Sequence, residues 1–233
     1  MGKTYSVILT SRIHREAHLD TVRTCIMNIR YFSDLDDVEF IVSDDASEFG
    51  ADELREHADI YIRRKTPLGC AWGWNQGLKV ANGEYLIVIS DDVFVGEGWI
   101  KGMRDALDKF PRAMVSSLGL TNVFDQKGIQ ESRVWFPGWI FMFRRETLDK
   151  VGYFDQQFMP FNYEDVDYWT RVYKAGYTTA RNFDIKVQHK EGQVIHNVEG
   201  NGEIDKANRE RYLKKWGFDP IPVLYGGGKF PWE

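Results

Sequence analysis

The sequence predicts an α/β fold in which a central, mostly parallel sheet is flanked by helices. Its first half alternates apolar, β-rich runs with segments of helical periodicity, the order that builds parallel sheets with right-handed crossovers. Residues 85–89 read Tyr-Leu-Ile-Val-Ile, a run without charge or breaker that indicates a strand buried on both faces. Asp91 and Asp92 come directly after it, at the edge where open α/β sheets bind ligands.

The remaining elements follow from hydrophobic periodicity and breakers along the chain. Further strands are expected over residues 5–10, 38–43, 60–63, 113–120, 140–143 and 185–192, and helices over 19–30, 52–57, 69–77, 98–110, 145–150, 163–175 and 204–216. Residues 121–137 are polar and irregular, and loops of this length are more often functional than not.

Composition indicates one cytoplasmic domain with a short C-terminal tail. The hydrophobic fraction of 43% is ample for a large core, and no linker divides the chain. The net charge of −5 argues against a strong, sequence-independent grip on polyanions. Cys25 and Cys70 show no spacing typical of a disulfide, which is the pattern expected for a protein in a reducing compartment. We see no signal peptide, and no apolar run approaches the ~18 residues that span a membrane.

Asp91 and Asp92 form the first candidate site. Two adjacent carboxylates repel each other unless a cation compensates them, and Mg²⁺ and Mn²⁺ favour carboxylate ligands shared with phosphate oxygens. The pair therefore predicts a divalent ion holding a nucleotide diphosphate. The alternative is a polar turn that caps the following helix. His189, near the end of the last predicted strand, would join the site if that strand returns to Asp92.

A second acid cluster, Glu164, Asp165 and Asp167, opens the helix predicted at 163–175, for which Asn162 is the expected N-cap. Helical spacing aligns Asp165 with Trp169 and Val172, so it alone of the three acids is expected to face the interior. The structural alternative to a catalytic role is that these acids stabilise the helix, because negative charges in the first turn interact favourably with the helix macrodipole. Burying a carboxylate without a partner or a function is costly, so the alternative does not explain an inward Asp165. An ionised acid at a helix N-terminus is suited to act as a general base.

Two further segments contain candidate binding residues. Gly69, Gly73 and Gly77 recur four apart, so they would let a helix approach either a ligand or the sheet closely, and Asn75 between them is a candidate polar contact to the ligand. Trp135 and Trp139 flank a Pro-Gly turn, where their rings would stack on a sugar or base, or else form a hydrophobic plug under the loop.

The chain resembles the GT-A glycosyltransferases of family 2 from residue 5 to about residue 217. The motifs that carry the resemblance are Phe40-Ile-Val-Ser-Asp-Asp-Ala-Ser47, Gly69 to Gly77 with Ala81-Asn-Gly-Glu-Tyr85, Ser90-Asp-Asp92, Val151-Gly-Tyr-Phe-Asp155, Glu164-Asp165 and His189-Lys-Glu-Gly192. Ser90 replaces the first acid of the usual Asp-x-Asp. The resemblance implies a GT-A domain over 1–217, with a nucleotide-sugar-binding half (1–95) and an acceptor-binding, catalytic half (96–217), followed by a tail at 218–233.

The resemblance also implies a role for each site residue. Asp165 would be the catalytic base of an inverting transfer, and Asp92 and His189 would hold Mn²⁺ or Mg²⁺. Donor contacts, with a UDP-sugar as the expected donor, would come from Thr10, Ser11, Asp45, Gly69, Asn75 and Asp91. Contacts to a carbohydrate or other hydroxyl acceptor would come from Trp135, Trp139 and Glu164.

Two alternatives remain open from the sequence. The compact size and the basic helix at 204–216 favour a glycosyltransferase acting on hydroxymethylated bases of phage DNA, although the acidic pI speaks against it. The other is a non-catalytic nucleotide- or carbohydrate-binding protein that kept the fold.

Overall fold

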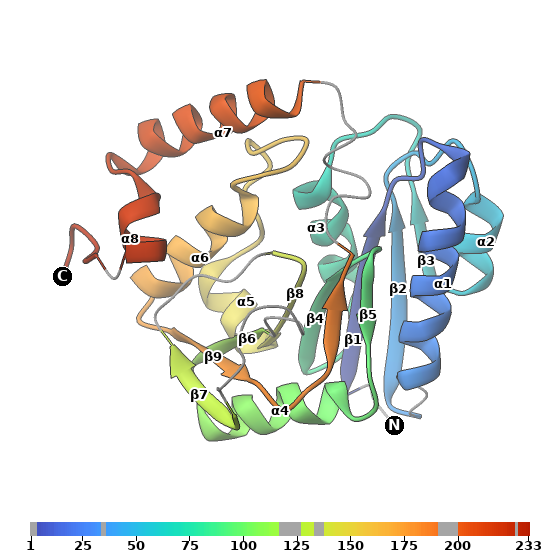
Figure 1. Cartoon of the computed structure of the whole chain (residues 1–233), viewed down its shortest axis with the longest axis horizontal. Helices are drawn as coiled ribbons and strands as arrows, with labels where there is room; N and C mark the ends of the chain where they lie inside the picture. Colours follow the sequence, from blue (N-terminus) through green and yellow to red (C-terminus); the bar gives the residue numbers. More distant parts are fainter. Residues whose placement is uncertain (1–3, 34–35, 117–126, 133–137, 191–199, 227) are drawn as a thin grey trace.

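The structure is a computed structural model, and it describes residues 4–33, 36–116, 127–132, 138–190, 200–226 and 228–233 (Figure 1). An eight-stranded sheet runs through the molecule in the order β3-β2-β1-β4-β8-β6-β9-β7. In chain order its strands are β1 (Tyr5–Ser11), β2 (Val38–Asp44), β3 (Ile60–Arg63), β4 (Tyr85–Ser90), β6 (Ala113–Ser116), β7 (Ile129–Ser132), β8 (Ile140–Arg144) and β9 (Thr178–Asn182).

The first four strands form the parallel half of the sheet. β1 lies between β2 and β4 with parallel register on both sides, and β3 extends the sheet beyond β2. β8 then pairs antiparallel with β4, while β9 returns parallel to β6. Every residue of β4 from Tyr85 to Ile89 is buried, which confirms the predicted mid-sheet strand.

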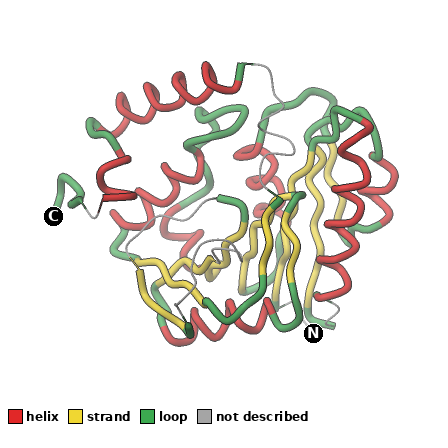
Figure 2. The backbone as a smooth tube through the Cα atoms, viewed as in Figure 1, coloured by secondary structure: helices red, strands yellow, loops and turns green. Residues whose placement is uncertain are grey.

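Helices cover both faces of the sheet (Figures 1 and 2). Alternate residues of β1 separate the two cores: Val7 and Leu9 pack with α1, α2 and α4, whereas Ile8 packs with α3, α5 and α6. The helices are α1 (Glu16–Phe32), α2 (Ala51–Glu56), α3 (Cys70–Val80), α4 (Trp99–Lys109), α5 (Arg145–Val151), α6 (Glu164–Lys174), α7 (Asn201–Trp216) and α8 (Pro220–Gly226). None of the helices in the described part of the chain has the length and apolar character needed to cross a membrane.

α3 packs unusually close to β1 through its small residues. A Cβ added at Gly73 would lie 2.3 Å from Cγ2 of Thr10, and one at Gly77 would lie 2.3 Å from Cγ2 of Ile8. Gly73 and Gly77 therefore let the helix approach the sheet closely. This is the second of the two roles expected for these glycines, the first being close approach to a ligand. Gly69 precedes the helix with φ of +89°.

A second, two-stranded sheet lies at the C-terminal end of β4. It pairs β5 (Val93–Val95) antiparallel with β10 (Val187–His189), and its register sets His189 opposite Val93. β5 begins at the residue after Asp92. Its pairing with β10 therefore brings residues 187–189 close to the acids that follow β4.

Two local predictions were wrong, and a third is only partly covered by the described residues. Residues 129–132 of the loop expected to be irregular form β7, which the antiparallel partner β9 stabilises. The strand expected at 113–120 is present as β6 up to residue 116, and residues 117–120 lie outside the described part. α6 begins at Glu164 after two left-handed residues, Asn162 and Tyr163, so Asn162 is not its N-cap.

The C-terminal residues pack on α6 and α7. Phe230 is buried, and its ring lies 5.2 Å from that of Tyr173 and 6.0 Å from that of Phe218, centroid to centroid. Trp232 stacks on Phe230 at 4.6 Å. The segment after residue 217 thus adds to the core behind α6.

Candidate active site

The two acids after β4 are buried and held differently. Each is 8% exposed, and the Ser11 hydroxyl donates to Asp91 Oδ2 over 2.6 Å. Burial, followed by the charge of Asp92, raises the pKa of Asp91 to about 7. Two carboxylates in this position thus carry their full charge near neutral pH only if a cation compensates them. Ser11 lies at 1% exposure and serves to orient Asp91.

Asp92 faces His189, as predicted. His189 Nε2 lies 3.1 Å from Asp92 Oδ1, and the indole ring of Trp139 stacks on the imidazole with centroids 5.1 Å apart. Nδ1 of His189 is buried and has no hydrogen-bond partner within the described residues. The pair combines a hard carboxylate oxygen with an imidazole nitrogen.

These two side chains fit part of the shell of a divalent ion. Neighbouring ligands of an octahedral ion with bonds of about 2.1 Å lie about 3 Å apart, which is close to the observed 3.1 Å. No group of three His, Cys, Asp or Glu side chains converges as a metal site within the described residues, so oxygens of a substrate and water would supply the other ligands. Donor diphosphates commonly share Mg²⁺ with one or two carboxylates in this way.

Asp45 organises the loop that leads into α3. It accepts the backbone N–H groups of Leu68 (2.8 Å) and Gly69 (2.6 Å), and it is 2% exposed. Burial raises its pKa, while the two N–H groups act in the opposite direction. Nearby, the buried Thr10 hydroxyl has no partner in the described part of the chain. Asp45, Gly69 and Thr10 therefore gather at one end of β1 and β2, and their contacts to a donor stay a prediction.

Asn75 makes a structural contact within the protein. Its side-chain nitrogen donates to the carbonyl of Phe154, and its side-chain oxygen accepts the N–H of the same residue, both over 2.8 Å. The amide is 2% exposed, and these two hydrogen bonds tie α3 to the segment after α5. Asn75 is thus a structural link, and its contact to a donor stays a prediction.

The three acids of α6 are also arranged differently from the helical-spacing prediction. Glu164 and Asp167 are more deeply buried than Asp165, at 6% and 0% exposure. Asp167 accepts from Arg171, Trp216 and Lys215, because α7 covers the face of α6 that we expected to be open to solvent. The prediction considered one helix alone and missed this cover.

Asp165 is held by two backbone amides. Its Oδ2 accepts the N–H of Gly138 (2.9 Å), and its Oδ1 accepts the N–H of Val166 (2.8 Å). Burial raises the pKa of Asp165 to about 6, and the amides limit that rise. The carboxyl is therefore mainly ionised at neutral pH and oriented by hydrogen bonds, as a general base requires.

Residues 138 and 139 connect the two acid clusters. Gly138 binds Asp165, and the next residue, Trp139, stacks on His189 and accepts the N–H of Ser90 over 2.9 Å. Sequence reasoning missed Gly138, since a backbone amide leaves no signature of its own. Trp139 is 7% exposed and packs in the hydrophobic core, which agrees with the alternative that it fills space under the loop. Its ring is not exposed for contact with an acceptor. Trp135 lies outside the described residues.

Cys70, at the start of α3, lies at the centre of this arrangement. Burial raises the pKa of its thiol well above the ordinary value, and the negative charges of four acids add to the rise. In order of influence these acids are Glu164, Asp91, Asp45 and Asp165. Acids of both clusters therefore lie within electrostatic range of a single side chain.

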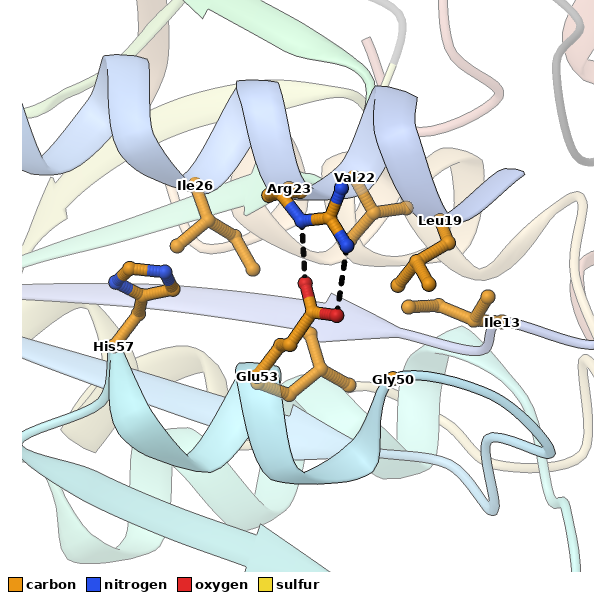
Figure 3. A pocket seen from close by; sticks show the side chains of 9 residues that line it. Ile13, Leu19, Val22, Arg23, Ile26, Gly50, Glu53 and His57 are labelled. Atoms are coloured by element: carbon orange, nitrogen blue, oxygen red, sulfur yellow. Dashed lines mark hydrogen bonds and ion pairs between the residues drawn. The ribbon is translucent and has the colours of Figure 1, made fainter. Parts of the chain in front are cut away.

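Two other features complete the description. Among the basic side chains of α7, Arg209 pairs with Asp219, and Lys215 pairs with Asp155 and Asp167. Whether the chain acts on DNA stays an open alternative. The pocket in Figure 3 lies between α1 and α2, where aliphatic side chains surround the Arg23–Glu53 ion pair (2.6 Å).

Comparisons with known proteins place the chain in a class. The sequence model of "Glycosyl transferase family 2" matches residues 6–169. No curated protein sequence matches the chain. The crystal structure of GalNAc-T7 with UDP, GalNAc and Mn²⁺ superposes with a TM-score of 0.69 at 16% identity, over 96% of this chain and 50% of that one. The structure of S. aureus TarS 1–349 gives 0.62 at 15% identity, over 94% and 73%.

A second structure of S. aureus TarS gives a TM-score of 0.61 at 15% identity, over 90% of this chain and 40% of that one. The chain thus spans half of the GalNAc-T7 structure and less than half of this TarS chain. The fold is that of a GT-A glycosyltransferase, which confirms the predicted fold class. The family match covers more than half of the sequence, and the chain belongs to glycosyl transferase family 2.

Proposed function

We propose that the chain transfers a sugar from a nucleotide-sugar donor to an acceptor hydroxyl, with inversion at the anomeric carbon and with a divalent metal ion. The observation that carries the proposal is the connection of the two acid clusters through consecutive residues. Gly138 binds Asp165, and Trp139 supports His189, which faces Asp92. A base for the nucleophile and ligands for the leaving group therefore belong to one site.

The donor would occupy the end of the parallel strands. Asp45, which binds the amides of the loop before α3, would lie on the base side, and Asp91, oriented by Ser11, would lie toward the ribose or sugar. A Mn²⁺ or Mg²⁺ ion held by Asp92 and His189 would supply the positive charge that stabilises a departing diphosphate. GalNAc-T7 was crystallised with UDP, GalNAc and Mn²⁺, and a UDP-sugar is the donor that we propose here.

Asp165 would act on the acceptor. Its ionised carboxylate accepts the proton of the acceptor hydroxyl as that oxygen forms a bond to the anomeric carbon. The bond from this carbon to the diphosphate oxygen breaks on the opposite side, so configuration inverts. The electron pair of the broken bond leaves with the diphosphate, and the proton remains on Asp165. Removal of such a base costs about 10²–10⁴ in rate.

A donor panel tests the proposal. Unfolding temperatures would be measured with UDP-, GDP- and dTDP-sugars, in Mn²⁺, in Mg²⁺ and in EDTA. A donor at 100 times its Kd stabilises the native state by about 2.7 kcal/mol, which raises Tm by roughly 5–10 °C for a chain of this size. We expect this rise with one nucleotide class and only with metal. An equal rise in EDTA, with no transfer to any acceptor, would instead identify a binding protein.

The stereochemistry is tested on the best donor. The anomeric configuration of the product, followed by proton NMR from the first turnovers, should be opposite to that of the donor sugar. Retention of configuration would exclude Asp165 as a base for direct displacement.

A further inference from the structure

Glu164 differs from the other acids of the site in having a buried oxygen without a partner. It is the first residue of α6, it is 6% exposed, and its Oε2 makes no hydrogen bond within the described part of the chain. Its two neighbours in the same turn are satisfied: Asp165 by two backbone amides, and Asp167 by three side chains. Of the three acids in this turn, Glu164 is the one whose buried oxygen has no hydrogen-bond partner among the described residues.

The surroundings of Glu164 favour its neutral form. Asp165 adjoins it on α6, and the charges of Glu164, Asp91 and Asp45 all act on the thiol of Cys70 at the start of α3. α7 contributes a neutral group, the Asn208 amide, which binds carbonyls of the segment before α6. An ionised carboxylate without a partner is costly in such a place.

The titration of Glu164 agrees with this geometry. Burial raises the pKa of Glu164 well above its ordinary value, and the charge of Asp165 raises it further. The backbone N–H of Glu164 itself acts in the opposite direction and is outweighed. When two neighbouring carboxyls have pKa values that are pushed apart, one serves as acid or donor and the other as base.

We propose that Glu164 is a neutral carboxylic acid whose O–H donates a hydrogen bond to an oxygen of the acceptor, beside the hydroxyl that Asp165 deprotonates. This rests on the proposed function, because it needs an acceptor at Asp165. A carboxylic acid can donate where a carboxylate can only accept, so the pair offers the acceptor one donor and one base. Glu164 would thereby position the nucleophile.

The protonation state can be tested without any transfer activity. A glutamate ionises near pH 4.3 in the unfolded chain, so a group that stays protonated in the folded state makes the protein less stable as pH rises above that value. E164Q removes this loss. We expect the Tm of E164Q minus that of the wild type to increase steadily from pH 4 to pH 8.

The control is E210Q, since Glu210 is exposed on α7. Its Tm difference from the wild type should stay constant over the same range. A difference for E164Q that is constant or that falls with pH would mean that Glu164 is ionised in the folded protein, and the proposal would be wrong. This outcome does not depend on whether the chain is an inverting transferase.

Kinetics test the hydrogen bond itself. We expect E164A to raise KM for the acceptor about tenfold, the value of one hydrogen bond, while KM for the donor changes little. E164Q keeps an N–H donor, so it should lose less than E164A. Wild-type activity should also fall at alkaline pH as Glu164 ionises, and E164Q should lack that fall. If E164Q loses as much rate as D165N, or if the donor KM rises instead, Glu164 does not have the proposed role.

Discussion

Gly138 donates its backbone N–H to the Asp165 carboxylate, with 2.9 Å between the nitrogen and Oδ2. The contact leaves no room for a side chain, because a Cβ at residue 138 would lie 2.6 Å from the Cβ and 2.8 Å from the Oδ2 of Asp165. Gly138 therefore both orients the proposed base and fixes its distance from the segment that reaches His189 through Trp139.

The first prediction concerns Gly138→Ala. The added methyl group should displace the Asp165 side chain and lower kcat about 100-fold, since a shift of about 1 Å at a reacting group has effects of this size. Donor-induced stabilisation should persist, because the donor residues lie on other elements. Gly202→Ala is the matched control: its Cβ would meet nothing within 4 Å, and it lies inside α7. Equal kcat values for both variants would contradict the role of Gly138.

The second prediction concerns the acidic side of the pH profile. Burial raises the pKa of Asp165 to about 6, and a base acts only when deprotonated. The rate should therefore fall as pH drops through 6, by about tenfold for each further unit. D165N should lower kcat by about 10²–10⁴ at neutral pH, lack this dependence and still bind donor.

The control for D165N is D52N, because the Asp52 side chain is 99% exposed on α2. Its pH profile and rate should match the wild type. Near-normal turnover of D165N would rule out Asp165 as the base.

The third prediction concerns the metal. Asp92→Ala removes the carboxylate that faces His189, so nucleotide-sugar stabilisation in Mn²⁺ should drop to the level that the wild type shows in EDTA. In EDTA the two proteins should respond equally to donor. Asp52→Ala provides the comparison for loss of an exposed acid. A full metal-dependent response in Asp92→Ala would place the ion elsewhere.

Much of the fold could be predicted because it depends on local signals. The uncharged run of β4 and the acids after it, the glycines of α3, and the Asp92–His189 pair all follow from short motifs whose order is specific to the family. The helices from α1 to α7 were located by periodicity to within a few residues, whereas α8 lies in the segment that was predicted to be a tail. Such features need little knowledge of distant contacts.

The features that were missed depend on partners far away in the sequence. The burial of Asp167 requires α7, which begins 34 residues later, and β7 is a strand because β9 pairs with it. Trp139 is buried because it meets His189 and the core rather than solvent. The Gly138 amide could not be singled out, since every residue except proline has one.

The fourth prediction separates a structural from a donor-binding role for Asn75. Its replacement by Ala leaves the N–H and C=O of buried Phe154 without partners, which should destabilise the protein by about 3 kcal/mol. If Asn75 has only this structural role, the shift in Tm that the donor induces should be the same in Asn75→Ala as in the wild type. Asn182→Ala is the matched control, because the Asn182 amide likewise bonds two backbone groups, the Gly102 carbonyl and the Asp184 N–H, at α4 and β9. A loss of donor response in Asn75→Ala that Asn182→Ala does not share would restore Asn75 to the donor site.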